Sequence, residues 1–171
     1  EALPGLENIP PPPEEGRTFE ENAAAKAIYY SRFAAVPVFA EDSGLEVQAL
    51  GGRPGIYSAR YAGPSATDEE NNLRLLEELR GVTDRRARFV SVIALAHSGK
   101  LVGTFRGEVE GVIADQPRGC HGFGYDPVFY YPPYGCTLAE ATPEQKFRVS
   151  HRGRAFEKLI RYLLENFEAA A

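Results

Sequence analysis

The sequence predicts an α/β protein in which a mixed β-sheet is flanked by helices. Three observations support this class. Helix-like and strand-like segments alternate without a strict βαβ rhythm, and two long strand-like segments in the middle of the chain require antiparallel pairing. The C-terminal segment carries apolar residues at helical spacing. A sheet covered by helices buries all of these apolar segments in one core.

Size and charge limit the possible classes of protein. The chain has 171 residues, of which 43% are apolar and 25% charged, which suits one globular domain over residues 1–171. The net charge of -5 argues against binding nucleic acid through its phosphates, because that mode needs a basic surface. Neither a run of roughly 20 apolar residues nor a signal peptide is present. We expect a cytoplasmic protein that binds neither nucleic acid nor membranes.

The N-terminal part is a proline-rich lead-in over residues 1–16, a composition typical of extended polyproline geometry. The chain starts at Glu1 and contains no methionine, so we expect the translated protein to begin upstream. Thr18 and Glu21 then form a capping-box pattern that predicts a helix over residues 19–33.

The segment after this helix predicts two short strands. An apolar run over residues 36–40 indicates a buried strand, and the polar residues 41–44 predict a turn that ends it. Residues 45–50 predict a second strand. Glycines in residues 51–55 then predict a loop whose backbone can approach a ligand closely.

The remaining elements are a helix, a hairpin, a strand and a last helix. Thr67 and Glu70 form a second capping box, and the helix that follows carries Leu73, Leu76 and Leu79 at packing positions before Gly81 ends it. Residues 89–96 and 101–109 flank a polar turn and predict a long β-hairpin, and residues 128–131 predict a buried strand. A helix is predicted over residues 152–167, with its apolar stripe facing the core.

The two cysteines, Cys120 and Cys136, form neither a CxxC pair nor a metal-ligand cluster. Free thiols in a reducing compartment are the ordinary interpretation, and a disulfide between them remains open.

Glu41 and Asp42 are adjacent carboxylates at the predicted end of a buried strand, where ligand crevices form in open sheets. Two neighbouring acids repel each other unless a cation neutralises them, and Mg²⁺ is held by one or two carboxylates plus substrate phosphates. The simpler alternative is a solvated turn in which Asp42 or Ser43 caps the next element. Glu14 and Glu15 form a second acidic pair in the lead-in.

Residues 119–127 form a glycine-rich loop that contains Phe123, Gly124, Tyr125 and Asp126. Aromatic side chains on such a loop offer a platform on which a nucleobase can stack. The alternative is that Phe123 and Tyr125 plug the core.

Ser150, His151, Arg152 and Gly153 stand at the start of the last predicted helix, where free N–H groups favour an anion or a carbonyl acceptor. The planar fork of Arg152 matches the O6 and N7 acceptors of a 6-oxopurine, whereas adenine presents a 6-amino donor. Alternatively, Ser150 is only a helix cap and Arg152 a surface charge. Lys26 and Lys146 could neutralise phosphate, although isolated lysines ordinarily face solvent.

Other catalytic classes lack support in the sequence. Ser43 lies in Asp-Ser-Gly and not in a GxSxG elbow, and the three histidines lack HExxH spacing. A phosphate loop of the pattern GxxxxGK followed by Ser or Thr is also missing from the sequence.

Taken in order, five segments closely resemble the inosine triphosphate pyrophosphatase family of non-standard purine nucleoside triphosphate pyrophosphatases. The segments are Thr18–Ala23 with Lys26, Glu41–Leu45, Leu50–Tyr61, Gly122–Pro127 and Ser150–Gly153. The resemblance covers most of the chain, and five motifs in the family's order are a specific signal.

The resemblance implies an elongated mixed sheet with two helical lobes around a central cleft, a homodimer, and Mg²⁺-dependent hydrolysis of ITP, dITP and XTP between the α and β phosphates. It makes Asp42 the proton acceptor and a metal ligand. From the acidic pairs described above, we add Glu41 and Glu14 as further candidate ligands. The resemblance also implies substrate contacts from the following residues: Lys26, Ser43, Phe123, Gly124, Tyr125, Asp126, Lys146, His151 and Arg152.

Two departures from the family pattern stand out. Nothing before Thr18 matches the SxNxxK-type loop that grips the triphosphate, and Glu41 stands where many relatives have Asp. Three alternatives therefore stay open: a catalytically impaired nucleotide-binding relative, a nucleic-acid-binding module that uses the aromatic loop, and a pyrophosphatase for another modified nucleotide.

Overall fold

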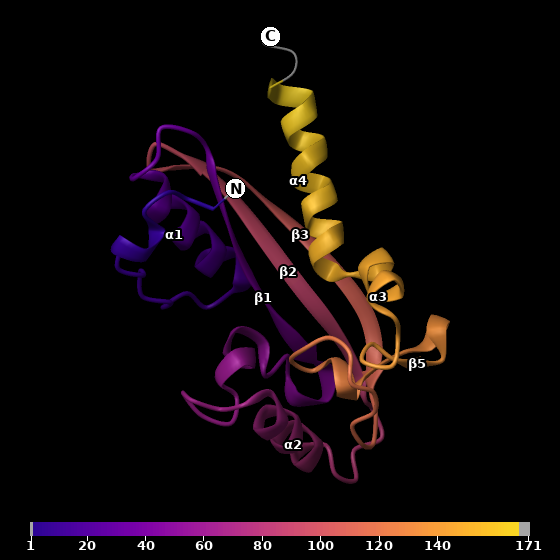
Figure 1. Ribbon diagram of the computed structural model, residues 1–171. Coiled ribbons are helices and arrows are strands. Elements are labelled where there is room, and N and C mark those ends of the chain that lie inside the picture. Colours follow the sequence, from indigo (N-terminus) through magenta and orange to yellow (C-terminus); the bar gives the residue numbers. More distant parts are fainter. Residues whose placement is uncertain (1, 168–171) are drawn as a thin grey trace. The chain divides into compact units, whose positions relative to one another are not determined.

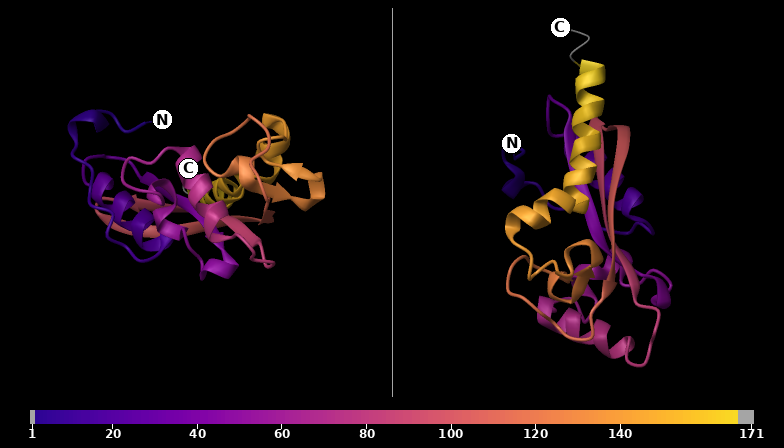
Figure 2. Two further views of the ribbon diagram at one scale, coloured as in Figure 1. Left: turned by 90° about the horizontal axis from the view of Figure 1, so that it is seen from below. Right: turned by 90° about the vertical axis from the view of Figure 1, so that its right-hand side faces the viewer.

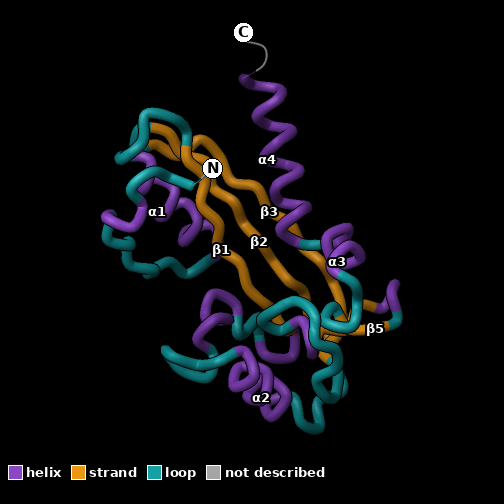
Figure 3. Tube along the Cα trace, viewed as in Figure 1, coloured by secondary structure: helices purple, strands orange, loops and turns teal. Residues whose placement is uncertain are grey.

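The computed structural model describes residues 2–167 and contains a five-stranded sheet with strand order β1-β2-β3-β4-β5 (Figures 1 and 3). The strands are β1 (Val38–Val47), β2 (Arg86–His97), β3 (Lys100–Ile113), β4 (Phe129–Tyr131) and β5 (Cys136–Thr137). The α-helices are α1 (Phe19–Ser31), α2 (Asp68–Glu78), α3 (Pro143–Val149) and α4 (His151–Phe167). The predicted class, a sheet with helices around it, is confirmed.

The sheet is antiparallel instead of mixed. β3 pairs with β4, and β4 with β5, in antiparallel register. β2 and β3 are joined by the two-residue turn Ser98–Gly99, which folds the chain back on itself. Between β1 and β2, Glu46 contacts Arg88 while Glu41 contacts Ser91, so the two strands run in opposite directions.

Contacts divide the described residues into two compact units, each with its own core. The first unit comprises the described residues up to 42, residues 91–106 and those from 155 onward, and the second comprises residues 43–90 and 107–154. In the first unit, Ile93 and Leu95 of β2 pack against Ala155 and Leu159 of α4. The larger core of the second unit is formed by these residues, among others: Leu45, Val47, Leu75, Leu79, Phe89, Val109 and Phe129.

The two helices predicted from capping boxes are confirmed. Thr18 caps α1 by accepting a bond from Glu21 N at 3.1 Å, and Thr67 with Glu70 forms a complete capping box on α2. Within α2 and its C-cap Leu79, the buried positions differ in part from the prediction. Leu75 and Leu79 are fully buried, whereas Leu73 is 63% exposed, because the core contacts the helix along an i, i+4 row.

The turn predicted over residues 41–44 is wrong, because β1 runs unbroken from Val38 to Val47. Asp, Ser and Gly favour turns in isolation. Here, partners from α1 and β2 satisfy the polar side chains of Glu41 and Asp42, so tertiary contacts override the local preference.

The C-terminal region contains one helix that was predicted and one that was not. Figures 1 and 2 show α4 lying along the β2–β3 hairpin of the first unit. Only part of its apolar stripe faces the core, since Ile160, Leu164 and Phe167 are each at least half exposed. α3 was not predicted, although Thr142 and Gln145 form a complete capping box with proline in the first turn.

Two further expectations concern the thiols and the membrane. Both cysteines are free, with Cys120 exposed and Cys136 half-buried. Within residues 2–167, every helix is too short or too polar to cross a bilayer.

Candidate functional site

A cluster of charged and polar side chains surrounds Asp42 in the first unit. Asn22 and Lys26 stand four residues apart on α1 and therefore share one face of the helix. Lys26 Nζ donates to Asp42 Oδ1 at 3.3 Å and to Glu41 O at 2.6 Å, and Asn22 Nδ2 donates to Asp42 Oδ2 at 3.2 Å. Glu14 Oε1 lies 3.5 Å from Lys26 Nζ. Glu14, Asn22, Lys26 and Asp42 are called the acidic cluster below.

Asn22 fixes the geometry of this cluster. Its side chain is 3% exposed and uses both ends of its amide, because Oδ1 accepts from Gly16 N at 2.8 Å while Nδ2 donates to Asp42. A buried amide with both ends bonded has one allowed orientation. The carboxylate of Asp42 is therefore held from one side by Asn22 and from the other by Lys26.

Burial raises the pKa of Asp42 above the ordinary value of an aspartate, and the charge of Glu14 acts in the same direction. The Lys26 ammonium and the Asn22 hydrogen bond oppose this shift without cancelling it. A carboxylate with a raised pKa binds a proton more strongly, which makes Asp42 a better general base than a solvated aspartate.

Glu41 and Asp42 do not form a carboxylate pair. Consecutive residues of a strand point to opposite faces of the sheet. Phe39, two residues before Glu41, contacts Phe156 of α4 with ring centroids 5.4 Å apart, whereas Asp42 contacts α1. Glu41 Oε1 accepts from Ser91 Oγ at 2.9 Å on β2. The structure therefore directs Glu41 away from the acidic cluster.

The acidic cluster has the donor chemistry of a magnesium site that is completed by substrate. Asp42 and Glu14 supply hard carboxylate oxygens next to one ammonium group, that of Lys26. Among the described residues, no group of three His, Cys, Asp or Glu side chains is gathered around one point. This set fits Mg²⁺, which commonly takes one or two carboxylates and completes its shell with waters and phosphates. The set does not fit a metal site in which protein side chains supply every ligand.

The second unit contains a small pocket with aromatic walls, called the aromatic pocket. Its volume is about 190 Å³, below the roughly 300–1,000 Å³ of pockets that enclose a whole drug-sized ligand. It therefore suits one ring system better than a complete nucleotide. Residues that line it include Ser43, Ser58, Asp68, Phe89, Phe123, Tyr125, Asp126, Lys146, His151 and Arg152.

Two cations lie over the ring of Phe123 in this pocket. Lys146 Nζ is 4.2 Å and the Arg152 guanidinium carbon 5.1 Å from the ring centroid. Lys146 also forms an ion pair with Asp126, which is 3% exposed, and Arg152 Nη2 lies 3.5 Å from Ser43 Oγ. The pocket thus places nitrogen donors beside an aromatic surface, an arrangement suited to a flat ligand with several acceptors.

His151 forms a wall of the pocket as a neutral imidazole. Its ring stacks on Phe89 at 5.0 Å with an interplanar angle of 15°, and Phe89 packs on Phe129 at 4.4 Å. Burial lowers the pKa of His151 to about 3, helped by the positive charges of Arg152 and Lys146. Near neutral pH this ring offers one donor and one acceptor.

The loop that carries Phe123 is tied down at several points. Asp126 Oδ2 accepts from Phe123 N at 3.0 Å, and Tyr125 O–H donates to Ser58 O at 2.6 Å. Burial raises the pKa of Tyr125, which keeps its hydroxyl as a donor. Gly122 has φ of 72° and lies so close to Asp126 that an added Cβ would clash with the carboxylate. Both the left-handed backbone and the close approach require glycine there.

The structure places the residues predicted from sequence in two groups. Lys26, Asp42 and Glu14 meet in the acidic cluster, and Glu41 does not join them. The predicted substrate contacts of the second unit all line the aromatic pocket: Ser43, Phe123, Gly124, Tyr125, Asp126, Lys146, His151 and Arg152.

The sequence reasoning overlooked Asn22 in the acidic cluster, and Phe89 and Ser58 in the pocket wall. The spacing of Asn22 and Lys26 on a predicted helix was a usable signal for the first of these. No comparable signal marked Phe89, because in the sequence it looks like any apolar residue of a strand.

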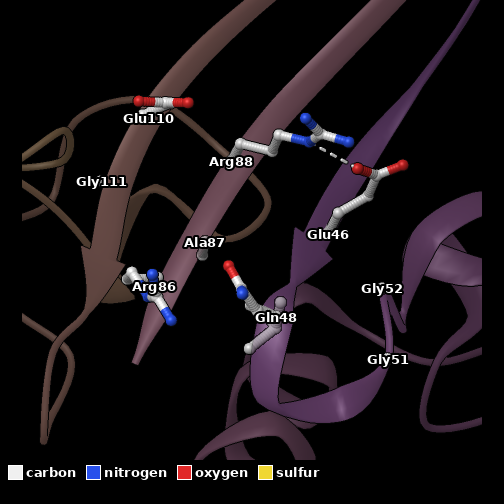
Figure 4. A pocket seen from close by; sticks show the side chains of 10 residues that line it. Glu46, Gln48, Gly51, Gly52, Arg86, Ala87, Arg88, Glu110 and Gly111 are labelled. Carbon is white, nitrogen blue, oxygen red and sulfur yellow. Dashed lines mark hydrogen bonds and ion pairs between the residues drawn. The ribbon is translucent and has the colours of Figure 1, made fainter. Parts of the chain in front are cut away.

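A second hollow of about 560 Å³ lies on the sheet face of the second unit (Figure 4). Its main cation, Arg88, is bonded to Glu46 at 2.6 Å and to Glu108 at 3.5 Å, and Arg86 is bonded to Asp84. The described residues that line this larger hollow include no aromatic side chain, whereas the aromatic pocket offers rings on which a base can stack, so the hollow is the weaker candidate for a ligand site.

Comparison with known families agrees with the motifs identified above, since residues 1–162 match the Ham1 family. The chain belongs to the Ham1 family. The Ham1 assignment rests on nearly the whole length of the chain and not on one motif.

Curated relatives of this Ham1 chain carry one recurrent name. It is 54% identical over 153 residues to the dITP/XTP pyrophosphatase of Syntrophobacter fumaroxidans, an alignment that covers 90% of this chain and 66% of the relative. It is 53% identical over 151 residues to a dITP/XTP pyrophosphatase of Thermus thermophilus, with 87% of this chain and 72% of the relative covered. The chain thus spans slightly less than two thirds of the first relative's length and about 70% of the second's.

Solved structures share the Ham1 fold. The Staphylococcus aureus Ham1 protein is 46% identical with a TM-score of 0.88, and the match covers 93% of this chain and 82% of that one. A nucleoside-triphosphatase, also named dITP/XTP pyrophosphatase, from Mycobacterium abscessus is 41% identical with a TM-score of 0.79, over 92% of this chain and 83% of that one.

Proposed function

We propose that this chain hydrolyses non-standard purine nucleoside triphosphates, namely ITP, dITP and XTP, to the monophosphate and pyrophosphate in a Mg²⁺-dependent reaction. The observation that carries the proposal is the aromatic pocket, in which Lys146 and Arg152 lie over Phe123 beside a neutral His151. The relatives named dITP/XTP pyrophosphatase support the same substrate class. The reaction removes damaged purine nucleotides from the precursor pool.

The pocket favours 6-oxopurines through the donors that Arg152 presents. Hypoxanthine and xanthine offer O6 and N7 as acceptors on one edge, which match the guanidinium fork. Adenine presents an amino donor at position 6, so a donor meets a donor and a polar pair is lost. Stacking on Phe123 adds affinity for any purine and therefore supplies binding without selection.

The acidic cluster supplies the hydrolytic residues. Asp42 accepts a proton from a water molecule, and the water oxygen attacks the α phosphorus. The bond to the α–β bridging oxygen breaks, and pyrophosphate leaves with the electron pair. Lys26 holds the Asp42 carboxylate in place and adds positive charge near the phosphates.

A Mg²⁺ ion held by Asp42 and Glu14 would offset the charge that develops on the leaving pyrophosphate. Glu41 is not assigned to this ion, because its carboxylate is directed to Ser91. The proposal has three further parts: one domain over residues 1–171, of which the family match covers residues 1–162, a homodimer, and a cytoplasmic location.

The direct test is pyrophosphate release from ITP, XTP, GTP and ATP, with Mg²⁺ and with EDTA. We expect release from ITP and XTP in the presence of Mg²⁺ and little from ATP, and the rate with GTP shows whether a 2-amino group is excluded as well. Binding of ITP without release would favour a nucleotide-binding protein that lacks catalysis. Equal rates for ITP and ATP would contradict base recognition by Arg152, whereas GTP does not test this contact, because guanine offers the same O6 and N7 acceptors as hypoxanthine.

A further inference from the structure

Helix α2 is hydrogen-bonded to the loop that carries Phe123 through one residue of that loop, Gly124. Gly124 N donates to Asp68 Oδ2 at 2.8 Å, and Asn72 Nδ2 donates to Gly124 O at 3.1 Å. Asp68 and Asn72 stand four residues apart on α2 and therefore share one face of the helix. Both backbone polar groups of Gly124 are thus bonded to side chains of a single rigid element.

The bond from Asn72 has a fixed direction. Its side chain is 4% exposed, and its Oδ1 has no hydrogen-bond partner among the described residues. Turning the amide round would place Oδ1 against Gly124 O, where two acceptors would repel each other. An unpaired buried acceptor destabilises the folded protein. An apolar residue of similar size would therefore stabilise the folded protein by burial at least as well as Asn72 does. What such a residue could not supply is the hydrogen bond to Gly124.

The position of Phe123 depends on the hydrogen bonds from α2 to Gly124. Its ring is 58% exposed, so apolar packing does not hold it. Lys146 and Arg152 contact the ring, and the backbone on either side sets the point from which the ring projects. Gly124 adopts a left-handed conformation with φ of 59°. Asp126 fixes the Phe123 amide, while Asp68 and Asn72 fix the next residue.

We infer, on the basis of the proposed function, that Asp68 and Asn72 are positioning residues for the purine. They set the place of Phe123 in the aromatic pocket, and through it they control how tightly the base binds. They do not take part in the attack of water, which is assigned to the acidic cluster. Substitutions at these two positions therefore act on KM and leave kcat nearly unchanged.

The test compares Asn72→Leu, Asp68→Ala and Asp68→Asn with wild type for ITP hydrolysis. We expect KM to rise roughly tenfold in Asn72→Leu and Asp68→Ala, the effect of one lost hydrogen bond, with kcat within about twofold. Asp68→Asn keeps an acceptor for Gly124 N and restores most of the affinity. Glu69→Ala, which removes an exposed acid from the same first turn, is the matched control and leaves KM unchanged.

Thermal unfolding separates positioning from a structural role. Asn72→Leu removes the unpaired acceptor, so its unfolding midpoint equals or exceeds that of wild type while KM rises. A midpoint that falls in parallel with affinity would overturn the inference. An unchanged KM in Asp68→Ala would overturn it as well.

Two readouts that need no hydrolysis separate this inference from the proposed function. IMP affinity, measured by calorimetry without metal, falls in Asn72→Leu and Asp68→Ala, and amide exchange over residues 119–126 becomes faster. If wild type releases no pyrophosphate, the proposed function fails, and these two changes decide the inference. Unaltered IMP affinity in both variants, or no measurable IMP binding to wild type, overturns it.

Discussion

The acidic cluster and the aromatic pocket are built on opposite principles. The cluster consists of a few charged and polar groups that hold one another, with Asp42 fixed between Lys26 and Asn22. The pocket is a wall of stacked rings joined to the core of the second unit, with its cations arranged over Phe123. Changes in the cluster should therefore alter reaction rate, whereas changes in the pocket should alter affinity and choice of base.

Metal removal gives the largest expected difference between the two regions. EDTA should reduce pyrophosphate release from ITP to the uncatalysed background, because the Mg²⁺ ion that Asp42 and Glu14 would hold would offset the charge on the leaving pyrophosphate. IMP binding, followed by calorimetry, should persist in EDTA, since the pocket contacts the base without metal. Loss of IMP binding in EDTA would show that the two regions are not separable.

Substitution of the two adjacent acids tests the assignment within β1. Asp42→Asn should lower kcat for ITP by roughly 10²–10⁴-fold, the range typical of a lost general base. Glu41→Gln can still accept from Ser91 and should change kcat less than about fivefold, because its side chain points to the other face of the strand. Steady-state kinetics at saturating Mg²⁺ distinguishes them. Equal losses would restore Glu41 as a metal ligand.

Arg152 should affect the choice of base by a smaller factor. Arg152→Ala should lower kcat/KM for ITP by roughly 10–100-fold and leave the low activity on ATP almost unchanged. Arg148→Ala, an exposed arginine of α3, serves as the control for a general loss of positive charge. A parallel fall for ITP and ATP would mean that Arg152 attracts phosphate and does not read the base.

The last prediction concerns His151 and the dependence of stability on pH. Its pKa is lowered to about 3 in the folded protein, so between about pH 6.5 and 3 the unfolded chain binds a proton that the folded chain does not. Stability from this group is complete above about pH 6.5 and falls on acidification, by at most about 1.4 kcal/mol per pH unit. In urea unfolding at several pH values, His151→Gln should lose less stability per pH unit than wild type. Identical slopes would contradict a neutral, buried His151.

Local signals in the sequence predicted much of the fold, and pairing determined the rest. Capping boxes located α1 and α2 correctly, because a cap is a contact between residues three apart. The turn expected at residues 41–44 was wrong, since those residues are satisfied by α1 and β2, far away in the sequence. No pattern confined to β1 contains that information.

For the candidate site, the sequence indicated many of the residues but not how they are arranged in space. The motif residues from Phe123 to Asp126 do meet His151 and Arg152, although about 25 residues separate them. Adjacency in sequence does not bring the side chains of Glu41 and Asp42 together, because strand geometry sends neighbours to opposite faces. Asp68 and Asn72 were not predicted as site residues, since their role depends on a loop some 50 residues away.

The stack of His151 on Phe89 and of Phe89 on Phe129 ties the pocket to the interior of the second unit. Phe129 is fully buried and Phe89 is 6% exposed, so this wall cannot yield without opening the core itself. A ligand then meets a rigid, preformed surface on that side. Shape-matched purine analogues should bind with little reorganisation, and bulkier ones should be refused instead of accommodated.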